Sequence, residues 1–188
     1  MLHMSHKRDS VSIADAVKDL NIVPVAISYE YDPCDSDKAR ELESHYRTGS
    51  YSKRPGEDME SIVRGITGYK GRVHVAFGEP LNEKSDNAGE VAASVDAQIL
   101  SLLRFFPVNH AAAQKLANRN QTAALPDSAQ RPLEAEVQQA HEWLDGRLRE
   151  IPSEQHLWFL GVYANALLRS SGIDVRQLQD PLAEEAPL

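Results

Sequence analysis

The fold is decided by residues 22–81, which begin with IVPVAISYE (22–30) and end with RVHVAFGEPL (72–81). Both segments are short and apolar, and the sequence between them is polar with helical character. A strand, intervening helices and a second strand are typical of a sheet with crossover helices. We therefore expect the two segments to be parallel strands of one sheet, joined by a right-handed crossover.

The two predicted strands differ in pattern. Residues 22–29 are almost all apolar and rich in β-branched side chains, which favours a strand that is covered on both faces. Pro24 cannot donate a ladder hydrogen bond, so it is expected at a strand end, an edge or a bulge. Val73, Val75 and Phe77 alternate with other residues, which predicts a strand with two unlike faces.

Helices are predicted on both sides of these strands. Ser12 followed by Asp15 matches a capping box and opens an apolar helical stripe over residues 13–20. Two helices are expected between the strands, and the second half of the chain is predicted to be helical, with Pro107 ending a long amphipathic helix. The further predicted segments are 35–47, 59–66, 95–106, 109–119, 133–150 and 153–171.

The predicted fold class is α/β: an incomplete sheet of at least two strands with crossover helices, followed by a helical C-terminal region. The expected divisions are 1–89 for the α/β part, 90–173 for the helical region and 174–188 for a flexible acidic tail. Two strands do not form a stable sheet alone. Either the sheet has strands that the pattern does not reveal, or its other strands lie in sequence outside this polypeptide.

Composition narrows the classes of function. The 188 residues carry a net charge of −8, which argues against nonspecific nucleic-acid binding. The one cysteine, Cys34, lies among acidic residues that would raise its thiol pKa, which opposes a nucleophilic role. His3 and His6 near the start of the chain are interpreted as solvated rather than as metal ligands, so no metal site is predicted. The longest apolar run, 157–168, is too short to span a bilayer.

IVPVAISYE, with Val23 and Pro24, and the downstream sequence through GRVHVAFGEPL resemble the C-terminal portion of bacterial 1-acylglycerol-3-phosphate acyltransferase-like proteins. The resemblance covers roughly residues 2–116. It implies an α/β fold in which Val23 and Pro24 lie on a strand beside the acyl channel. It also implies acyl transfer from acyl-CoA or acyl carrier protein to a glycerol phosphate hydroxyl, with no other cofactor.

The catalytic motif of that family is missing. The motif is His-x4-Asp, in which the histidine acts as general base and the carboxylate orients it. None of the seven histidines has an aspartate five residues later. His74 with Glu79 comes nearest, but the expected strand position of His74 differs from the loop that the motif uses. We therefore expect no catalytic residue in this chain and no acyltransferase activity from the chain alone.

A cluster of basic residues is the remaining candidate site: Lys53, Arg54, Arg64, Lys70 and Arg72. The cluster is interpreted first as a solvated face. As a binding site it would take a phosphate, from glycerol phosphate, from CoA or from anionic lipid headgroups. Arg64 and Arg72 are the preferred candidates, because a guanidinium can hold phosphate through two hydrogen bonds.

Two hypotheses of function follow. In the first, the chain is the C-terminal segment of a glycerolipid acyltransferase-like protein of phospholipid synthesis. In the second, it is a non-catalytic binding or regulatory module that retains the tail of that fold. The expected location is the cytoplasm, with a peripheral contact to the inner face of the membrane. The stripe over residues 95–106 could make such a contact, although core packing is the preferred interpretation.

Overall fold

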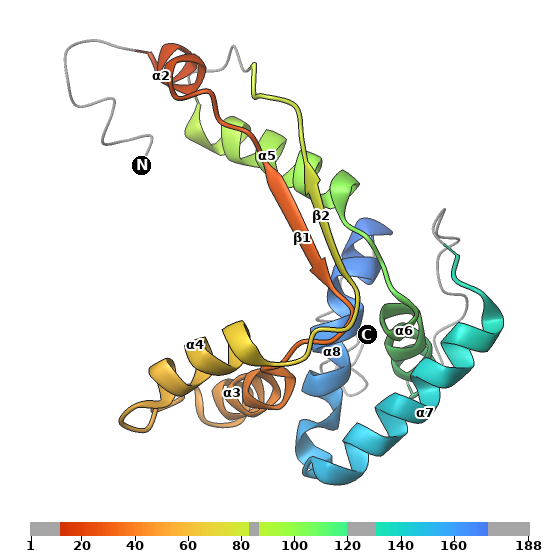
Figure 1. The fold of residues 1–188 in the computed structure, drawn as a ribbon. Coiled ribbons are helices and arrows are strands. Elements are labelled where there is room, and N and C mark those ends of the chain that lie inside the picture. The colour runs from red at the N-terminus through yellow and green to blue at the C-terminus, as the bar shows by residue number, and fades with distance from the viewer. Residues whose placement is uncertain (1–11, 83–86, 120–130, 173–188) are drawn as a thin grey trace, which may run out of the picture. The chain divides into compact units, whose positions relative to one another are not determined.

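The computed structural model describes residues 12–82, 87–119 and 131–172, and Figure 1 shows their fold. The architecture is α/β, with a two-stranded sheet and a helical C-terminal region, as the sequence predicts. The elements are, in chain order, α2 (Ile13–Leu20), β1 (Val25–Tyr29), α3 (Asp35–Thr48), α4 (Glu57–Thr67), β2 (Val73–Phe77), α5 (Ala88–Leu102), α6 (Pro107–Arg119), α7 (Glu134–Glu150), a 3₁₀ turn (Ser153–Gln155) and α8 (His156–Ser170).

The chain forms two compact units, and each is discontinuous in sequence. The first contains residues up to Ser28 together with His74–Arg104, and the second contains Tyr29–Val73 together with the residues from Phe105 onward. The sequence prediction instead divides the chain at residues 89 and 173, and its predicted tail, 174–188, lies outside the described residues. The difference arises because the segment between the two strands, which contains α3 and α4, belongs to the second unit. The chain then returns to the first unit at His74.

The two strands are antiparallel, so the predicted parallel arrangement is wrong. Gly78 donates its N–H to the carbonyl of Pro24, and Leu81 donates its N–H to the carbonyl of Ile22. The residue numbers rise on one strand as they fall on the other, which is the pairing of antiparallel strands. The physical reason is that the helices between the strands double back instead of crossing the sheet. Glu30 accordingly donates its N–H to the carbonyl of Arg72, beside the point where the chain left the strand.

Gly71 makes this return possible. Its φ of 61° lies in the left-handed region, and a Cβ at this position would stand 2.7 Å from the ring of Tyr31. Only glycine combines that backbone conformation with such a close approach.

In the first unit one face of the strand pair is covered at β1, whereas His74 on the same face of β2 is exposed. Ala26 and Ser28 are buried, and Ser28 Oγ accepts a hydrogen bond of 3.0 Å from the backbone N–H of Arg104. A Cβ on Gly78 would lie within 3.2 Å of Leu102, so α5 packs directly against the strands there. A small core of Val17, Leu81 and Val91 joins α2 and α5 to the ends of the strands.

The opposite face of the strands is exposed, which corrects the expectation of a strand covered on both sides. The hydrogen-bond register pairs Pro24 with Gly78, so Val25 lies opposite Phe77 and Ile27 lies opposite Val75. These four side chains, called here the ribbon face, are between 39% and 71% exposed. Two antiparallel strands with α5 on one side leave the other side open.

In the second unit the helices form the main hydrophobic core. Leu116 of α6, Leu144 of α7 and Phe159 of α8 are fully buried at its centre. Tyr163 is also buried there, and Trp143 and Trp158 pack against the cluster.

Other helix boundaries largely confirm the sequence predictions, except that α5 spans Ala88–Leu102 instead of 95–106 and that Pro107 has a different place. Ser12 caps α2 by accepting the N–H of Asp15, as the capping signal predicts. Pro107, however, begins α6 instead of ending α5, which already stops at Leu102. Proline suits the first helical position because its missing N–H would have no partner there.

Candidate functional site

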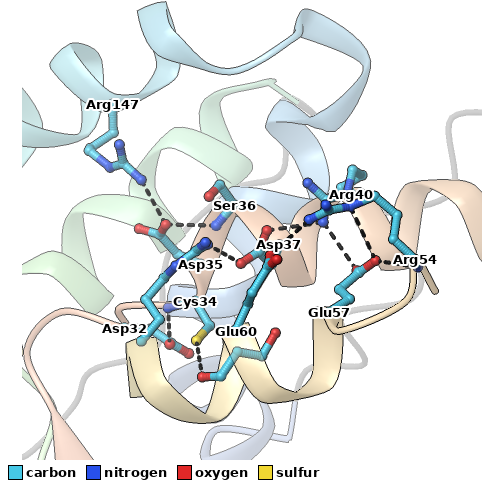
Figure 2. Close-up of polar contacts among 12 residues, drawn as sticks. Asp32, Cys34, Asp35, Ser36, Asp37, Arg40, Arg54, Glu57, Glu60 and Arg147 are labelled. Carbon is cyan, nitrogen blue, oxygen red and sulfur yellow. Dashed lines mark hydrogen bonds and ion pairs between the residues drawn. The ribbon is translucent and has the colours of Figure 1, made fainter. Parts of the chain in front are cut away.

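The most concentrated group of polar contacts lies where α3 and α4 begin, within the second unit (Figure 2). The segment Asp32 to Asp37 supplies turn formers and acidic residues, which suit the N-terminal end of a helix. Asp32 accepts the N–H of Cys34 at 2.8 Å and Asp35 accepts the N–H of Ser36 at 2.6 Å. Backbone donors at the start of α3 are thereby satisfied by side chains of the same segment.

Asp35 is the buried centre of this group, at 3% exposure. Its carboxylate accepts hydrogen bonds from the hydroxyl of Tyr163 at 2.7 Å and from the guanidinium of Arg147 at 2.8 Å. The Tyr163 hydroxyl in turn accepts the N–H of Asp32 at 3.2 Å. Burial, and then the charge of Asp35, raise the pKa of Tyr163, so this hydroxyl stays protonated and serves as a donor. The arrangement connects α3 to α7 and α8.

A second node connects α3 to α4. Glu57, buried at the start of α4, accepts hydrogen bonds from the Tyr51 hydroxyl, from Arg40 at 3.2 Å and from the N–H of Arg54 at 2.8 Å. The bond from Tyr51 and the backbone bond from Arg54 lower the pKa of Glu57. Asp37 accepts from Arg40 at 3.0 Å and also from Arg64.

Cys34 lies between the two nodes. Its Sγ donates to the carbonyl of Ser61 at 3.5 Å, which adds another contact from α3 to α4. Burial, and then the charge of Asp32, raise the pKa of the thiol. The thiolate is therefore disfavoured, in agreement with the sequence-based argument against a nucleophile.

Arg64 and Arg72, the predicted phosphate ligands, are each held by carboxylates. Arg64 bonds to Asp37. Arg72 bonds to Glu30 at 2.8 Å and to Glu136 at 3.2 Å, and its guanidinium lies 5.4 Å from the centre of the Phe106 ring. Partial burial tends to raise the pKa of Glu30, but the hydrogen bonds from Arg72 outweigh it and lower that pKa. A phosphate at either arginine would have to displace or share these carboxylates.

The other basic residues have similar surroundings. Lys53 pairs with Asp58 at 2.8 Å and Arg54 pairs with Glu60 at 2.9 Å, both at exposed positions. Lys70 instead donates to the backbone carbonyls of Ile66 and Gly68 at the C-terminal end of α4. The positive charge of Lys70 therefore lies at the C-terminal end of α4, where the partial negative charge of the helix dipole attracts it.

The positions implied by the resemblance lie at the start of the strand pair. Val23 is partly exposed and Pro24 is buried immediately before β1, consistent with a proline at a strand end. His74 of β2 and Glu79 are both exposed, and no hydrogen bond joins them. His3 and His6 lie outside the described residues.

Sequence reasoning missed the contacts of Asp35 with Arg147 and Tyr163. Its position at the start of α3 was visible, but its partners are 112 and 128 residues away.

Within the described ranges, no cluster of three or more His, Cys, Asp or Glu could hold a metal ion. Across the same ranges, no single helix is both long and apolar enough to cross a membrane.

Comparison of the chain with protein-family models, curated proteins and solved structures gave no match. The polar group at the start of α3 and α4 consists of carboxylates, and each carboxylate already accepts hydrogen bonds from side-chain or backbone donors of this chain. It fixes four helices to one another, and it offers no general base in the described residues that is paired as a His-x4-Asp motif requires.

Proposed function

We propose that this chain is the C-terminal segment of a glycerolipid acyltransferase-like protein. The proposal rests on the resemblance of residues 22–81 to that family. It is supported by one structural observation, the exposed ribbon face of Val25, Ile27, Val75 and Phe77. A two-stranded sheet with an apolar open face is what remains when neighbouring elements of a larger sheet are supplied by other sequence.

In the complete enzyme a histidine outside this segment would take the proton of the acceptor hydroxyl. The hydroxyl oxygen would then form the new ester bond to the acyl carbon while the carbon–sulfur bond of the donor breaks, and the leaving thiolate would take the proton from the histidine to become the free thiol. This segment would contribute the strand that follows Val23 and Pro24 beside the acyl chain. Arg64 and Arg72 are the candidates for phosphate contact, each by exchanging a carboxylate partner for the phosphate.

A second candidate function is a non-catalytic binding or regulatory module. The observation that favours it is the helical core of the second unit, in which Leu116, Leu144 and Phe159 are already fully buried. That unit would have a core of its own whether or not the ribbon face is covered.

Two measurements test the proposal. The DNA upstream of the codon for Met1 should encode a His-x4-Asp block, in frame or displaced by a frameshift. The polypeptide that joins this block to the chain should transfer a labelled acyl group from acyl-CoA to glycerol phosphate, whereas the purified chain alone should not. Turnover by the chain alone that disappears in His74→Ala would contradict the proposal and assign the base to His74.

A further inference from the structure

The helix α4 is attached to the rest of its unit without burying its apolar side chains. Among the residues of α4, all of which the structure describes, Glu57 alone is buried. The large apolar residues of the helix are between 51% and 73% exposed: Met59, Ile62, Val63 and Ile66. Tertiary packing of an apolar face normally supplies most of the stability of a helix. In this conformation α4 does not receive that contribution.

Polar contacts instead hold α4 against α3. They join Arg40 with Glu57 at 3.2 Å, Arg64 with Asp37, and the Cys34 thiol with the carbonyl of Ser61 at 3.5 Å. Figure 2 shows Arg40 between Asp37 and Glu57. The side chains of Arg40 and Arg64 are 40% and 44% exposed, and ion pairs with one exposed partner add little stability each.

The lengths and surroundings of the two helices also differ. An isolated helix of eleven residues, the length of α4, is marginal in water, so α4 should lose its helical structure when it leaves α3. The helix α3 is held independently of α4, because Ala39 belongs to the main hydrophobic core and Asp35 bonds to Tyr163 of α8. Loss of the α4 contacts therefore leaves the anchors of α3 in place.

We propose that α4 unfolds and refolds as a separate unit, controlled by the carboxylates of Glu57 and Asp37, while α3 and the helical core stay folded. Segments with few buried apolar contacts are the ones that open locally in native proteins. Order–disorder transitions of one segment are also a common kind of conformational switch. Opening would separate Arg64 from Asp37 and the Cys34 thiol from Ser61. This inference does not depend on the proposed function.

The test is amide hydrogen exchange of the purified full chain, followed by mass spectrometry of its peptides. The amides of α4 should exchange at least about a hundredfold faster than those of α8. Glu57→Gln removes a charged acceptor and should speed exchange in α4 by roughly tenfold, because hydrogen bonds to charged groups are the stronger ones. Exchange in α8 should stay the same in this variant. Added salt should also speed exchange in α4, because it screens the ion pairs.

The matched control is Glu43→Gln. Glu43 is also a buried carboxylate, but it pairs with Arg47 of its own helix at 2.6 Å. This variant should leave exchange in α4 unchanged. Exchange in α4 as slow as in α8 would overturn the proposal, and so would equal effects of Glu57→Gln and Glu43→Gln on α4. If Glu57→Gln speeds exchange in α8 as much as in α4, the helix belongs to the cooperative core and the proposal fails. Exchange in α4 that slows as protein concentration rises would assign its apolar side chains to a contact with a second copy and also overturn the proposal.

Discussion

Leu144 on α7 and Ile27 on β1 are side chains of equal size in opposite surroundings. Leu144 is fully buried among α6, α7 and α8, whereas Ile27 is 51% exposed on the ribbon face. Ile27 belongs to an almost continuous apolar run, whereas Leu144 belongs to a helix whose sequence is mostly polar. The comparison teaches that apolar sequence locates an element but does not say whether this polypeptide itself covers it.

Among substitutions that only shorten a side chain, the largest effect is expected in the helical core. Leu144→Ala should lower the free energy of unfolding by about 2–5 kcal/mol, because it removes buried methyl groups and leaves a cavity. Leu133→Ala is the matched control, since Leu133 caps the same helix and is 73% exposed. It should change stability by less than about 0.5 kcal/mol. Urea unfolding followed by circular dichroism measures both, and equal effects would show that the core is not closed as described.

An intermediate effect is expected at Asp35. Asp35→Asn should destabilise the chain by about 1–3 kcal/mol, because Arg147 and Tyr163 lose a charged acceptor inside the protein. Asp37→Asn, two residues along the same helix, should cost less than about 1 kcal/mol because its partners Arg40 and Arg64 are more exposed.

A double-mutant cycle of Asp35→Asn with Tyr163→Phe separates the pair from its surroundings. A coupling energy near zero would contradict the hydrogen bond between these two side chains. A clear coupling would support a buried connection between α3 and α8 that sets this part of the molecule apart from the ribbon.

Local elements were predictable because their signals lie within a few residues. Ser12 with Asp15 marked the start of α2, and the alternation of Val73, Val75 and Phe77 marked β2. Each of these signals depends on neighbours in sequence, so no knowledge of distant segments was needed.

Strand direction and the site around Asp35 were not predictable in this way. Direction depends on whether α3 and α4 double back, which is determined by contacts such as Glu30 with Arg72. The partners of Asp35 come from α7 and α8 and have no local signal. An uninterrupted apolar run at 22–29 likewise did not distinguish a covered strand from one with an open face.

The smallest change in stability is expected at the ribbon face. In a strand covered on both sides a charge at Ile27 would be very costly, but the 51% exposure of Ile27 removes that reason. Ile27→Asp should cost only the loss of its cross-strand contact with Val75, about 0.2–1 kcal/mol. Ala26→Asp, one residue away on the buried face, should prevent the first unit from folding because it places a charge at a position with 1% exposure.

The same pair of variants tests whether the ribbon face lacks a cover. The unsubstituted chain should bind a hydrophobic dye or self-associate, since an open apolar sheet face is a site of association. Ile27→Asp should reduce both while the thermal melt stays nearly unchanged. If Ile27→Asp instead unfolds the chain as Ala26→Asp does, the ribbon face is covered within this polypeptide. The helical core and the ribbon would then not differ in closure, and the case for a missing neighbour, on which the proposed function depends, would fail.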